Sequence, residues 1–287
     1  MNANIVAGID IGGSHITAGL IDLQAHSIIR NSFIRRHVNS KASADQIIKQ
    51  WTDAILSCKA CHSDTSKRIG IAMPGPFDYE KGISFIKGQD KYELLYGLNV
   101  KELLAKELEI DEGDIFMMND ASCFLKGEVF GGAATNSNNV IGITLGTGLG
   151  SATFRDEIIY DGDLFYAPYK DGAAEDYLST RWFIKEYKKL TGTTVKNVKE
   201  IRERIPGDET ATSLFAGFGK NLGEVLAVYI KKHSAETVVI GGNIINAWEL
   251  FMPETKKVLS NYAINVSLLK AELGEEAALL GAGSLCI

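Results

Sequence analysis

The chain has 287 residues, of which 45% are hydrophobic, and this is enough for two modest domains or one large one, each with its own core. Its formal net charge is −6, which argues against a nucleic-acid-binding body, because such a body needs a basic face. No segment approaches the roughly 20 apolar residues of a membrane-spanning helix, and the first residues lack a signal-peptide pattern. The sequence therefore predicts a soluble, cytoplasmic protein without a membrane or nucleic-acid partner.

The first half of the chain alternates short apolar runs with segments of helical spacing. The apolar runs predict strands over residues 5–9, 18–22, 28–34, 69–73 and 115–118. The helical spacing predicts helices over residues 45–58, 100–108 and 121–130. Pro74, Gly75 and Pro76 end the fourth of these strands with a turn.

The second half follows the same alternation. Strands are predicted over residues 140–145, 151–154 and 237–240, and helices over residues 175–190, 213–232 and 275–285. Such alternation is typical of α/β layers with at least partly parallel sheets.

Each half begins with one local plan, a buried strand, a glycine-rich turn and a second strand. The two copies cover residues 5–20 and 140–154. This repetition indicates a duplicated domain in which each copy carries one glycine-rich hairpin. Two such hairpins that face each other would be able to hold a phosphate chain between them.

The first hairpin turn combines a carboxylate with flexible backbone. Gly12 and Gly13 let backbone N–H groups approach a ligand closely, and Ser14 adds a hydroxyl donor. Asp10 ends the strand with a carboxylate that suits the water shell of Mg²⁺. The alternative is an ordinary hairpin with a turn aspartate. The second turn contains Gly146, Thr147 and Gly148. Its glycine spacing alone is weak evidence for phosphate binding, but together with the first turn it supports a pair of phosphate-binding loops.

Two further strand ends carry candidate site residues. Asn119 and Asp120 stand between a strand and a helix, where a carboxylate is able to accept the proton of an attacking hydroxyl. Asp120 is equally a common type of helix N-cap, and without context that interpretation is favoured. Gly241 and Gly242 end another strand, where bare backbone would lie flat against an adenine ring or form a plain turn.

The joint order of these segments resembles the ROK family of bacterial sugar kinases and sugar-responsive regulators, within the actin-like ATPase superfamily. The matching segments are residues 8–14 (GIDIGGS), 70–76 (GIAMPGP), 119–122 (NDAS) with Gly127 and Glu128, 144–150 (TLGTGLG), 240–243 (IGGN) and 281–283 (GAG). The resemblance implies an α/β fold of two actin-like (ribonuclease H-like) lobes, with mixed sheets flanked by helices and an ATP cleft between the lobes. The expected lobes are residues 1–119 with 272–287, and residues 120–271.

The resemblance also implies a role for each motif. ATP and Mg²⁺ are the implied cofactors. Asp10 would lie at the metal–phosphate end, with the metal bound through water, and Asp120 would be the catalytic base. Asn119 would bind sugar hydroxyls, and Gly75 would line the sugar pocket. The remaining nucleotide contacts would come from Gly12, Gly13, Ser14, Gly146, Thr147, Gly148, Gly241 and Gly242.

The chain departs from the family at two places. Members usually carry a Glu-x-Gly-His segment and a cysteine cluster that binds structural zinc, whereas residues 151–175 contain no cysteine and no histidine. We therefore expect no zinc site. Glu175 would be the surviving sugar-binding glutamate, or else an acid that caps the following helix. Gln89 lies in a polar loop that would touch the sugar or form a solvated turn.

The leading functional hypothesis is ATP-dependent phosphorylation of a hexose, most simply glucose at its 6-hydroxyl. A kinase for an amino- or N-acetyl-hexose, or for another small molecule, is an alternative of the same chemistry. A non-catalytic sugar or nucleotide sensor is the alternative of another class, and Asp120 is the main argument against it. Family members are often homodimers, and the regulators carry an added helix-turn-helix domain that we do not expect here.

Overall fold

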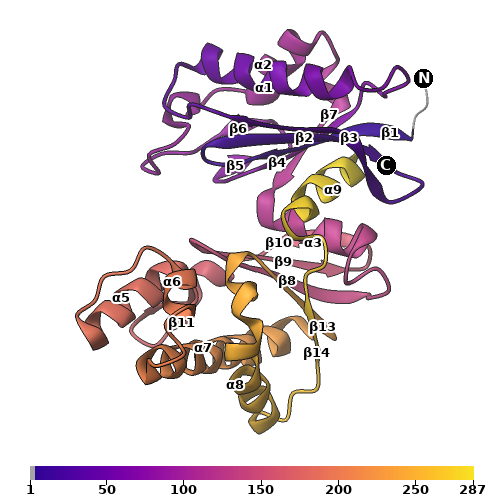
Figure 1. Cartoon of the computed structure of the whole chain (residues 1–287). Coiled ribbons are helices and arrows are strands. Elements are labelled where there is room, and N and C mark those ends of the chain that lie inside the picture. Colours follow the sequence, from indigo (N-terminus) through magenta and orange to yellow (C-terminus); the bar gives the residue numbers. More distant parts are fainter. Residues whose placement is uncertain (1–3) are drawn as a thin grey trace. The chain divides into compact units, whose positions relative to one another are not determined.

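Two compact units make up the protein, and the computed structural model describes residues 4–287 of it (Figure 1). The first unit contains the chain up to Thr135 together with Glu275–Ile287, and the second contains Asn136–Gly274. The lobes expected from the sequence divide the chain after Asn119 instead. The difference concerns helix α3 (Asp120–Gly131), which packs on α9 (Ala277–Gly283) within the first unit.

The first unit is built on a five-stranded mixed sheet. Its strands run in the order β3-β2-β1-β4-β7, where β1 pairs antiparallel with β2, and β4 is parallel to both β1 and β7. All five strands predicted for this half are present. They are β1 (Ile5–Ile11), β2 (His15–Asp22), β3 (Ser27–His37), β4 (Ile69–Met73) and β7 (Ile115–Asn119), with a small hairpin of β5 (Phe77–Asp78) and β6 (Ile83–Ser84).

Helices cover both faces of the first sheet (Figure 1). On one face lie α1 (Ala44–Lys59) and α2 (Val100–Leu108), and on the other lie α3 and the yellow α9. Ser43 starts α1 with a capping box, in which its hydroxyl and the Gln46 side chain each accept a backbone N–H of the other residue. The helical spacing read from the sequence buries Ile47, Ile48, Trp51, Ile55 and Cys58 against the sheet.

Glycines allow α9 to approach its neighbours closely. A Cβ on Gly127 of α3 would lie 2.0 Å from the Ala277 carbonyl oxygen, and one on Gly281 would lie 1.9 Å from that of Cys123. On the sheet side, a Cβ on Gly70 would lie 1.8 Å from the Ala282 carbonyl oxygen. These separations are far below van der Waals contact, so the packing of α9 requires glycine at these positions.

The second unit repeats the plan of the first. Its sheet has the order β10-β9-β8-β13-β14, with the same succession of antiparallel and parallel neighbours. Matching strand order and direction are the expected result of the duplication that the two glycine turns indicate. The strands are β8 (Asn139–Leu145), β9 (Leu149–Arg155), β10 (Ile158–Asp161), β13 (Thr237–Gly241) and β14 (Ser267–Lys270), with a small hairpin of β11 (Pro168–Tyr169) and β12 (Gly172–Ala173).

The helices of the second unit correct one sequence expectation. The helix predicted over residues 175–190 is two helices, α4 (Ala174–Tyr177) and α5 (Thr180–Thr191). The chain breaks because Ser179 is extended and the Thr180 N–H donates to the Gly146 carbonyl, 2.8 Å away, instead of continuing a helix. The other helices are α6 (Val198–Arg202), α7 (Glu209–His233) and α8 (Trp248–Asn261).

An aromatic cluster forms the centre of the second core. Phe183 of α5 packs against Phe215 and Phe218 of α7, and Phe218 meets Phe251 of α8 edge to face. Offset and edge contacts of this kind add to the apolar area that the helices bury. Among residues 4–287, no helix combines the length and the apolar character that a membrane crossing requires.

Candidate functional site

The carboxyl end of the first sheet brings the two predicted acids to one edge. Asp10 of β1 pairs with Ala72 of β4, and Ala72 pairs with Met118 of β7, so Asp10 stands in one row with the end of β7. Asp120 follows β7 as the first residue of α3. Both acids therefore belong to the first unit, at the edge where parallel sheets generally bind ligands.

Asp10 is electrostatically perturbed. Burial, followed by the negative charge of Asp120, raises the pKa of the Asp10 carboxyl to about 6. Arg35 opposes this rise and Glu275 adds to it. The carboxylates of Asp120 and Glu275 thus outweigh the opposing charge of Arg35 in their effect on Asp10, and a bound cation is stabilising under this condition.

Asn119, rather than Asp120, occupies the N-cap position of α3. Its side-chain oxygen accepts the backbone N–H groups of Ala121 at 2.9 Å and Ser122 at 3.4 Å. Asp120 stands next, exposed at the positive end of the helix, with its Oδ1 2.9 Å from the Ala121 nitrogen. Asn119 therefore caps α3, the role that the sequence also allows for Asp120. The Asp120 carboxylate lies in the first turn of α3, in the field of the helix dipole.

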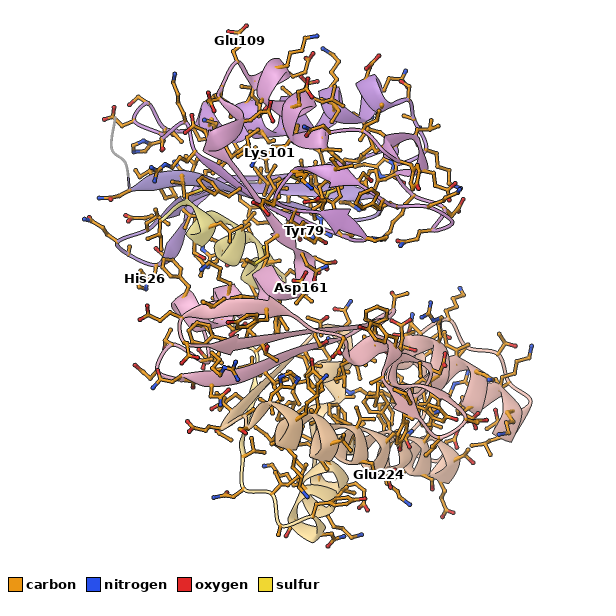
Figure 2. All side chains as sticks on the ribbon, turned by 180° about the vertical axis from the view of Figure 1, so that it is seen from behind. His26, Tyr79, Lys101, Glu109, Asp161 and Glu224 are labelled. Carbon is orange, nitrogen blue, oxygen red and sulfur yellow. The ribbon has the colours of Figure 1, made fainter. Side chains whose placement is uncertain are left out.

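Tyr79 orients the amide of Asn119, and the sequence gives no signal of this contact. The Asn119 Nδ2 donates to the Tyr79 hydroxyl at 3.1 Å, and that hydroxyl donates to the Met73 carbonyl at 3.0 Å. Tyr79 is labelled in Figure 2. The chain of hydrogen bonds fixes the Asn119 side chain between its helix and the end of β4.

The first glycine turn is supported from outside the sheet by Tyr92. The Gly12 N–H donates to the His15 carbonyl at 2.8 Å, which closes the turn between β1 and β2. The hydroxyl of the buried Tyr92 donates to the Gly12 carbonyl at 2.6 Å. Gly13 and Ser14 are exposed at the tip. Tyr92 is a second supporting residue without a local sequence signal, because its contact spans 80 residues of chain.

The polar loop around Gln89 reaches the Pro-Gly-Pro turn. The Gln89 Nε2 donates to the Gly75 carbonyl at 3.2 Å, and both residues belong to the first unit. A Cβ on Gly75 would lie 3.0 Å from the Tyr79 hydroxyl and 3.9 Å from the Asn119 Nδ2. The structure therefore brings together Gly75, Gln89 and Asn119, which are the three sugar-site candidates of the first unit.

The remaining nucleotide-site candidates gather in the second unit. The Gly146 N–H donates to the Gly148 carbonyl at 3.0 Å within the second glycine turn, which also contains Thr147. Gly242, at the end of β13, has a φ of 85° and lies so close to the turn that a Cβ would be 2.3 Å from the Leu145 carbonyl oxygen. Glu175 also contacts this turn, because its carboxylate accepts the Leu149 N–H at 2.9 Å.

Metal-ligating side chains do not cluster in the described part of the chain. Among residues 4–287, no group of three or more histidine, cysteine, aspartate and glutamate residues is placed to hold a metal ion. Such a group is not what Mg²⁺ requires, because proteins commonly hold this ion through one or two carboxylates together with waters and substrate phosphates.

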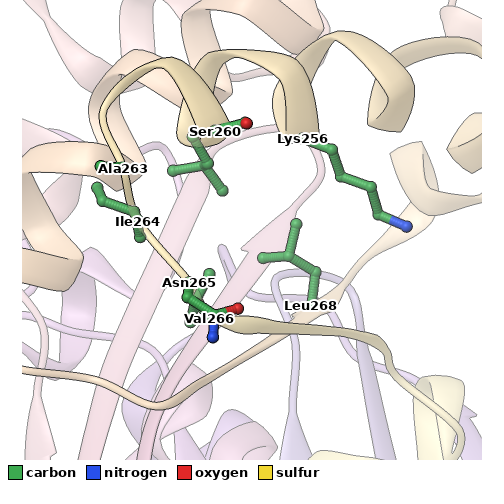
Figure 3. Close-up of a pocket in the computed structure, with 8 residues that line it drawn as sticks. Lys256, Ser260, Ala263, Ile264, Asn265, Val266 and Leu268 are labelled. Atoms are coloured by element: carbon green, nitrogen blue, oxygen red, sulfur yellow. The ribbon is translucent and has the colours of Figure 1, made fainter.

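A pocket lies away from all predicted site residues. It has a volume of about 540 Å³ and is formed by the end of α8 and the start of β14 (Figure 3). Its lining mixes apolar side chains with Lys256, Ser260 and Asn265. None of the motif residues contributes to it, so we do not assign it to the site.

Comparison with known proteins places the whole chain in a family context. The model of the ROK family matches residues 6–167 and 169–287. The chain is 26% identical to a glucokinase of Thermotoga maritima, over 97% of this chain and 96% of the relative. It is 24% identical to an N-acetyl-D-glucosamine kinase of Photobacterium profundum, over 98% of both chains. A ROK family glucokinase from Streptomyces griseus, solved with glucose and AMPPNP, superposes with a TM-score of 0.77 at 23% identity and 98% coverage of both chains.

Proposed function

The chain belongs to the ROK family, and from this premise we propose that it is an ATP-dependent kinase of a small sugar, with the 6-hydroxyl of glucose as the first acceptor. The observation that carries this proposal is the pair of acids at one sheet edge, Asp10 and Asp120, whose charges are coupled. The glucokinase and N-acetyl-D-glucosamine kinase relatives support a hexose or an N-acetyl-hexose as acceptor.

Asp120 is the proposed general base. Its carboxylate accepts the proton of the sugar hydroxyl as the hydroxyl oxygen attacks the γ-phosphorus of ATP. A sugar O–P bond forms, the bond from the γ-phosphorus to the bridging oxygen breaks, and ADP leaves. The orientation of Asn119 by Tyr79 supports its assignment to a sugar hydroxyl, beside Gly75 and Gln89.

The nucleotide and its metal are assigned to the two glycine turns and to Asp10. Gly12, Gly13 and Ser14 are the proposed phosphate contacts of the first unit. The residues around Asp10 fit a divalent cation, because burial and then the negative charges of Asp120 and Glu275 raise the pKa of this carboxyl, and a bound cation would offset those charges. Mg²⁺ bound there would neutralise charge on the transferring phosphate. The proposed nucleotide contacts of the second unit are Gly146, Thr147, Gly148, Gly241 and Gly242.

The first experiment measures ADP release from Mg-ATP over a panel of hexoses, amino-hexoses and N-acetyl-hexoses. We expect turnover above the no-sugar rate with at least one of them. Turnover with an N-acetyl-hexose alone would correct the acceptor, not the reaction. Binding of nucleotide and of sugar without turnover on any member would overturn the kinase and favour the sensor.

The second experiment replaces Asp120 by asparagine, which keeps its size and removes its charge. We expect kcat to fall by about 10²- to 10⁴-fold, because a positioned general base is lost, while ATP-analogue binding changes by no more than about twofold. The matched control is Asp53→Asn, on the exposed face of α1. Full activity of the Asp120 variant would exclude Asp120 as the base.

A further inference from the structure

Glu175 holds the second glycine turn by a direct contact. Its Oε2 accepts the Leu149 N–H at 2.9 Å, and its Oε1 is paired with the guanidinium of Arg181. Both carboxylate oxygens are thus engaged inside the second unit. From the sequence, Glu175 is expected either to bind the sugar or to cap the following helix, whereas these contacts direct its carboxylate to the backbone of the turn.

The Glu175 carboxylate lies directly against Gly148. A Cβ on Gly148 would lie 2.5 Å from the Glu175 Oε2, so the carboxylate is able to take its present position because residue 148 is a glycine. At the other end of the turn, the Gly146 carbonyl accepts the Thr180 N–H at 2.8 Å. Residues 175–180, which run from α4 to the first residue of α5, therefore contact the turn at two points.

The helix that carries Glu175 is itself held by a cluster that we name the hairpin clamp. It consists of Tyr169, Lys170, Tyr177, Asn221 and Glu224. The Lys170 ammonium lies 5.0 Å from the centre of the Tyr169 ring and 5.1 Å from that of Tyr177, the last residue of α4. The two rings meet edge to face with their centres 5.1 Å apart. Lys170 thereby links the β11–β12 hairpin to α4 through cation–π contacts.

Within the hairpin clamp, the β11–β12 hairpin is hydrogen-bonded to the long helix α7. Lys170 Nζ donates to the Asn221 Oδ1 at 2.7 Å, and the Tyr169 hydroxyl donates to the Glu224 Oε2 at 2.5 Å. Asn221 is buried, and Glu224 stands one helical turn further along α7, where Figure 2 labels it. Charge-assisted hydrogen bonds at partly buried sites are among the stronger polar contacts in proteins. A continuous series of side-chain contacts therefore connects α7, the hairpin, α4 and the glycine turn.

We propose that Glu175 is a positioning residue for nucleotide binding, which shapes the second glycine turn, and that the hairpin clamp holds Glu175 in place. This inference rests on the proposed function for the identity of the ligand. Loss of the carboxylate releases the Leu149 N–H and the Arg181 side chain. The turn then samples other shapes, and the nucleotide must order it on binding, which weakens affinity.

The test measures the dissociation constant of AMPPNP by calorimetry, without sugar, for Glu175→Ala, Glu175→Gln, Lys170→Met and Tyr169→Phe. We expect about tenfold weaker binding for Glu175→Ala, the size of one lost charge-assisted hydrogen bond, and a smaller loss for each clamp variant. The affinity for the sugar should change by no more than about twofold. Controls are Glu203→Ala and Lys189→Met, which remove exposed ion pairs elsewhere in the second unit.

A double variant, Lys170→Met with Glu175→Ala, tests the link between the hairpin clamp and Glu175. If the clamp acts through Glu175, the double variant binds AMPPNP no more weakly than Glu175→Ala alone. Additive losses would overturn the link. Weaker sugar affinity with unchanged AMPPNP affinity would overturn the positioning role and make Glu175 a sugar ligand.

The experiment separates the inference from the proposed function because AMPPNP binding requires no acceptor. If no sugar is phosphorylated but Glu175→Ala still weakens AMPPNP binding, the kinase proposal fails and the inference stands. If sugars are phosphorylated and Glu175→Ala leaves AMPPNP affinity unchanged, the inference alone fails. A wild-type protein that does not bind AMPPNP would overturn both. Glu175→Gln and Tyr169→Phe preserve side-chain size, so they remain informative where a larger truncation impairs folding.

Discussion

At the scale of single residues, Asp10 makes the stability of the protein depend on pH. Its carboxyl has a pKa of about 6, against 3.8 as its ordinary value, so between these values the folded state binds more protons than the unfolded state. The free energy of unfolding of metal-free protein should therefore fall as pH rises from 4 to 6, by about 2 kcal/mol, and change little above that.

Asp10→Asn removes this titration, so the variant should become more stable than the wild type as pH rises through that interval. Urea unfolding of both proteins in EDTA, at pH 4 to 8, measures the difference. Parallel stability curves would show that Asp10 has an ordinary pKa. Asp64→Asn, at an exposed turn, is the control.

Gln89 tests the sugar side of the site. Gln89→Ala removes the hydrogen bond to the Gly75 carbonyl, so we expect the KM for the sugar to change by about three- to tenfold while the KM for ATP stays within about twofold. Asp90→Ala in the same loop is the control, because Asp90 pairs with Lys41 instead. Equal effects of both substitutions on a panel of sugars would show that the loop does not select the acceptor.

The glycine turns and the two acids are visible in the sequence. The side chains that hold these turns and the Asn119 amide in place by hydrogen bonds are not. Asp10 and Asp120 follow apolar runs, and the end of a strand is visible in a local pattern. Tyr79 and Tyr92 act through hydroxyls that reach across the fold, and no local spacing records such contacts. Glu175 is recognisable in the sequence as a candidate site residue, but its contact with the Leu149 N–H depends on how α4 is placed.

At the scale of elements, the contact of α3 with α9 should be intolerant of any added side-chain atom. Gly281→Ala would place a methyl group against the Cys123 carbonyl, so we expect a loss of about 2 kcal/mol or more in the free energy of unfolding. Gly217→Ala in α7 is the matched control. Its Cβ would have 3.8 Å to the nearest side chain, so the better helix propensity of alanine should leave stability equal or higher.

Thermal and urea unfolding measure both glycine variants. A Gly281 variant as stable as the wild type would mean that α9 is free to shift away from α3, contrary to the packing described above.

Elements with strong periodicity were predictable, and those fixed by long-range contacts were not. The apolar spacing of α1 and the runs of β1, β4 and β8 are local signals. The break between α4 and α5 is not, because residues 174–191 have continuous helical character and the interruption comes from the Gly146 carbonyl. The β11–β12 hairpin was missed for a related reason, since its two-residue strands are held by side chains of α7.

At the scale of the whole molecule, a substitution in α9 should destabilise the entire first unit, although α9 is far from the other parts of that unit in sequence. Leu280 of α9 is buried, and α9 packs on β1 and β4. Leu280→Ala should therefore accelerate hydrogen exchange of protected amides in β1, β4 and α9 by about 30-fold or more, because such a truncation costs at least about 2 kcal/mol. Amides of β13 and α7 in the second unit should be nearly unchanged. Uniform acceleration across the chain would show that the two units do not open independently.

The division into units was only partly visible in the sequence. The duplicated strand–turn–strand plan indicates two halves, and the two sheets share one strand order. The boundary is less visible, because α3 follows β7 directly and looks like the start of a new half. Its place in the first unit is set by the glycine contacts with α9, which lies about 150 residues further along the chain.

The return of the last segment, Glu275–Ile287, to the first unit has a consequence for the order in which the protein is made. On the ribosome, Asn136–Gly274 is synthesised completely before α9 exists, so the second unit has its whole sequence first. The first unit, by contrast, keeps the face of its sheet that α9 covers only partly covered, by α3, until Glu275–Ile287 has also been synthesised. Nascent chains stopped just before Glu275 should thus carry a finished second unit and a first unit that chaperones still recognise.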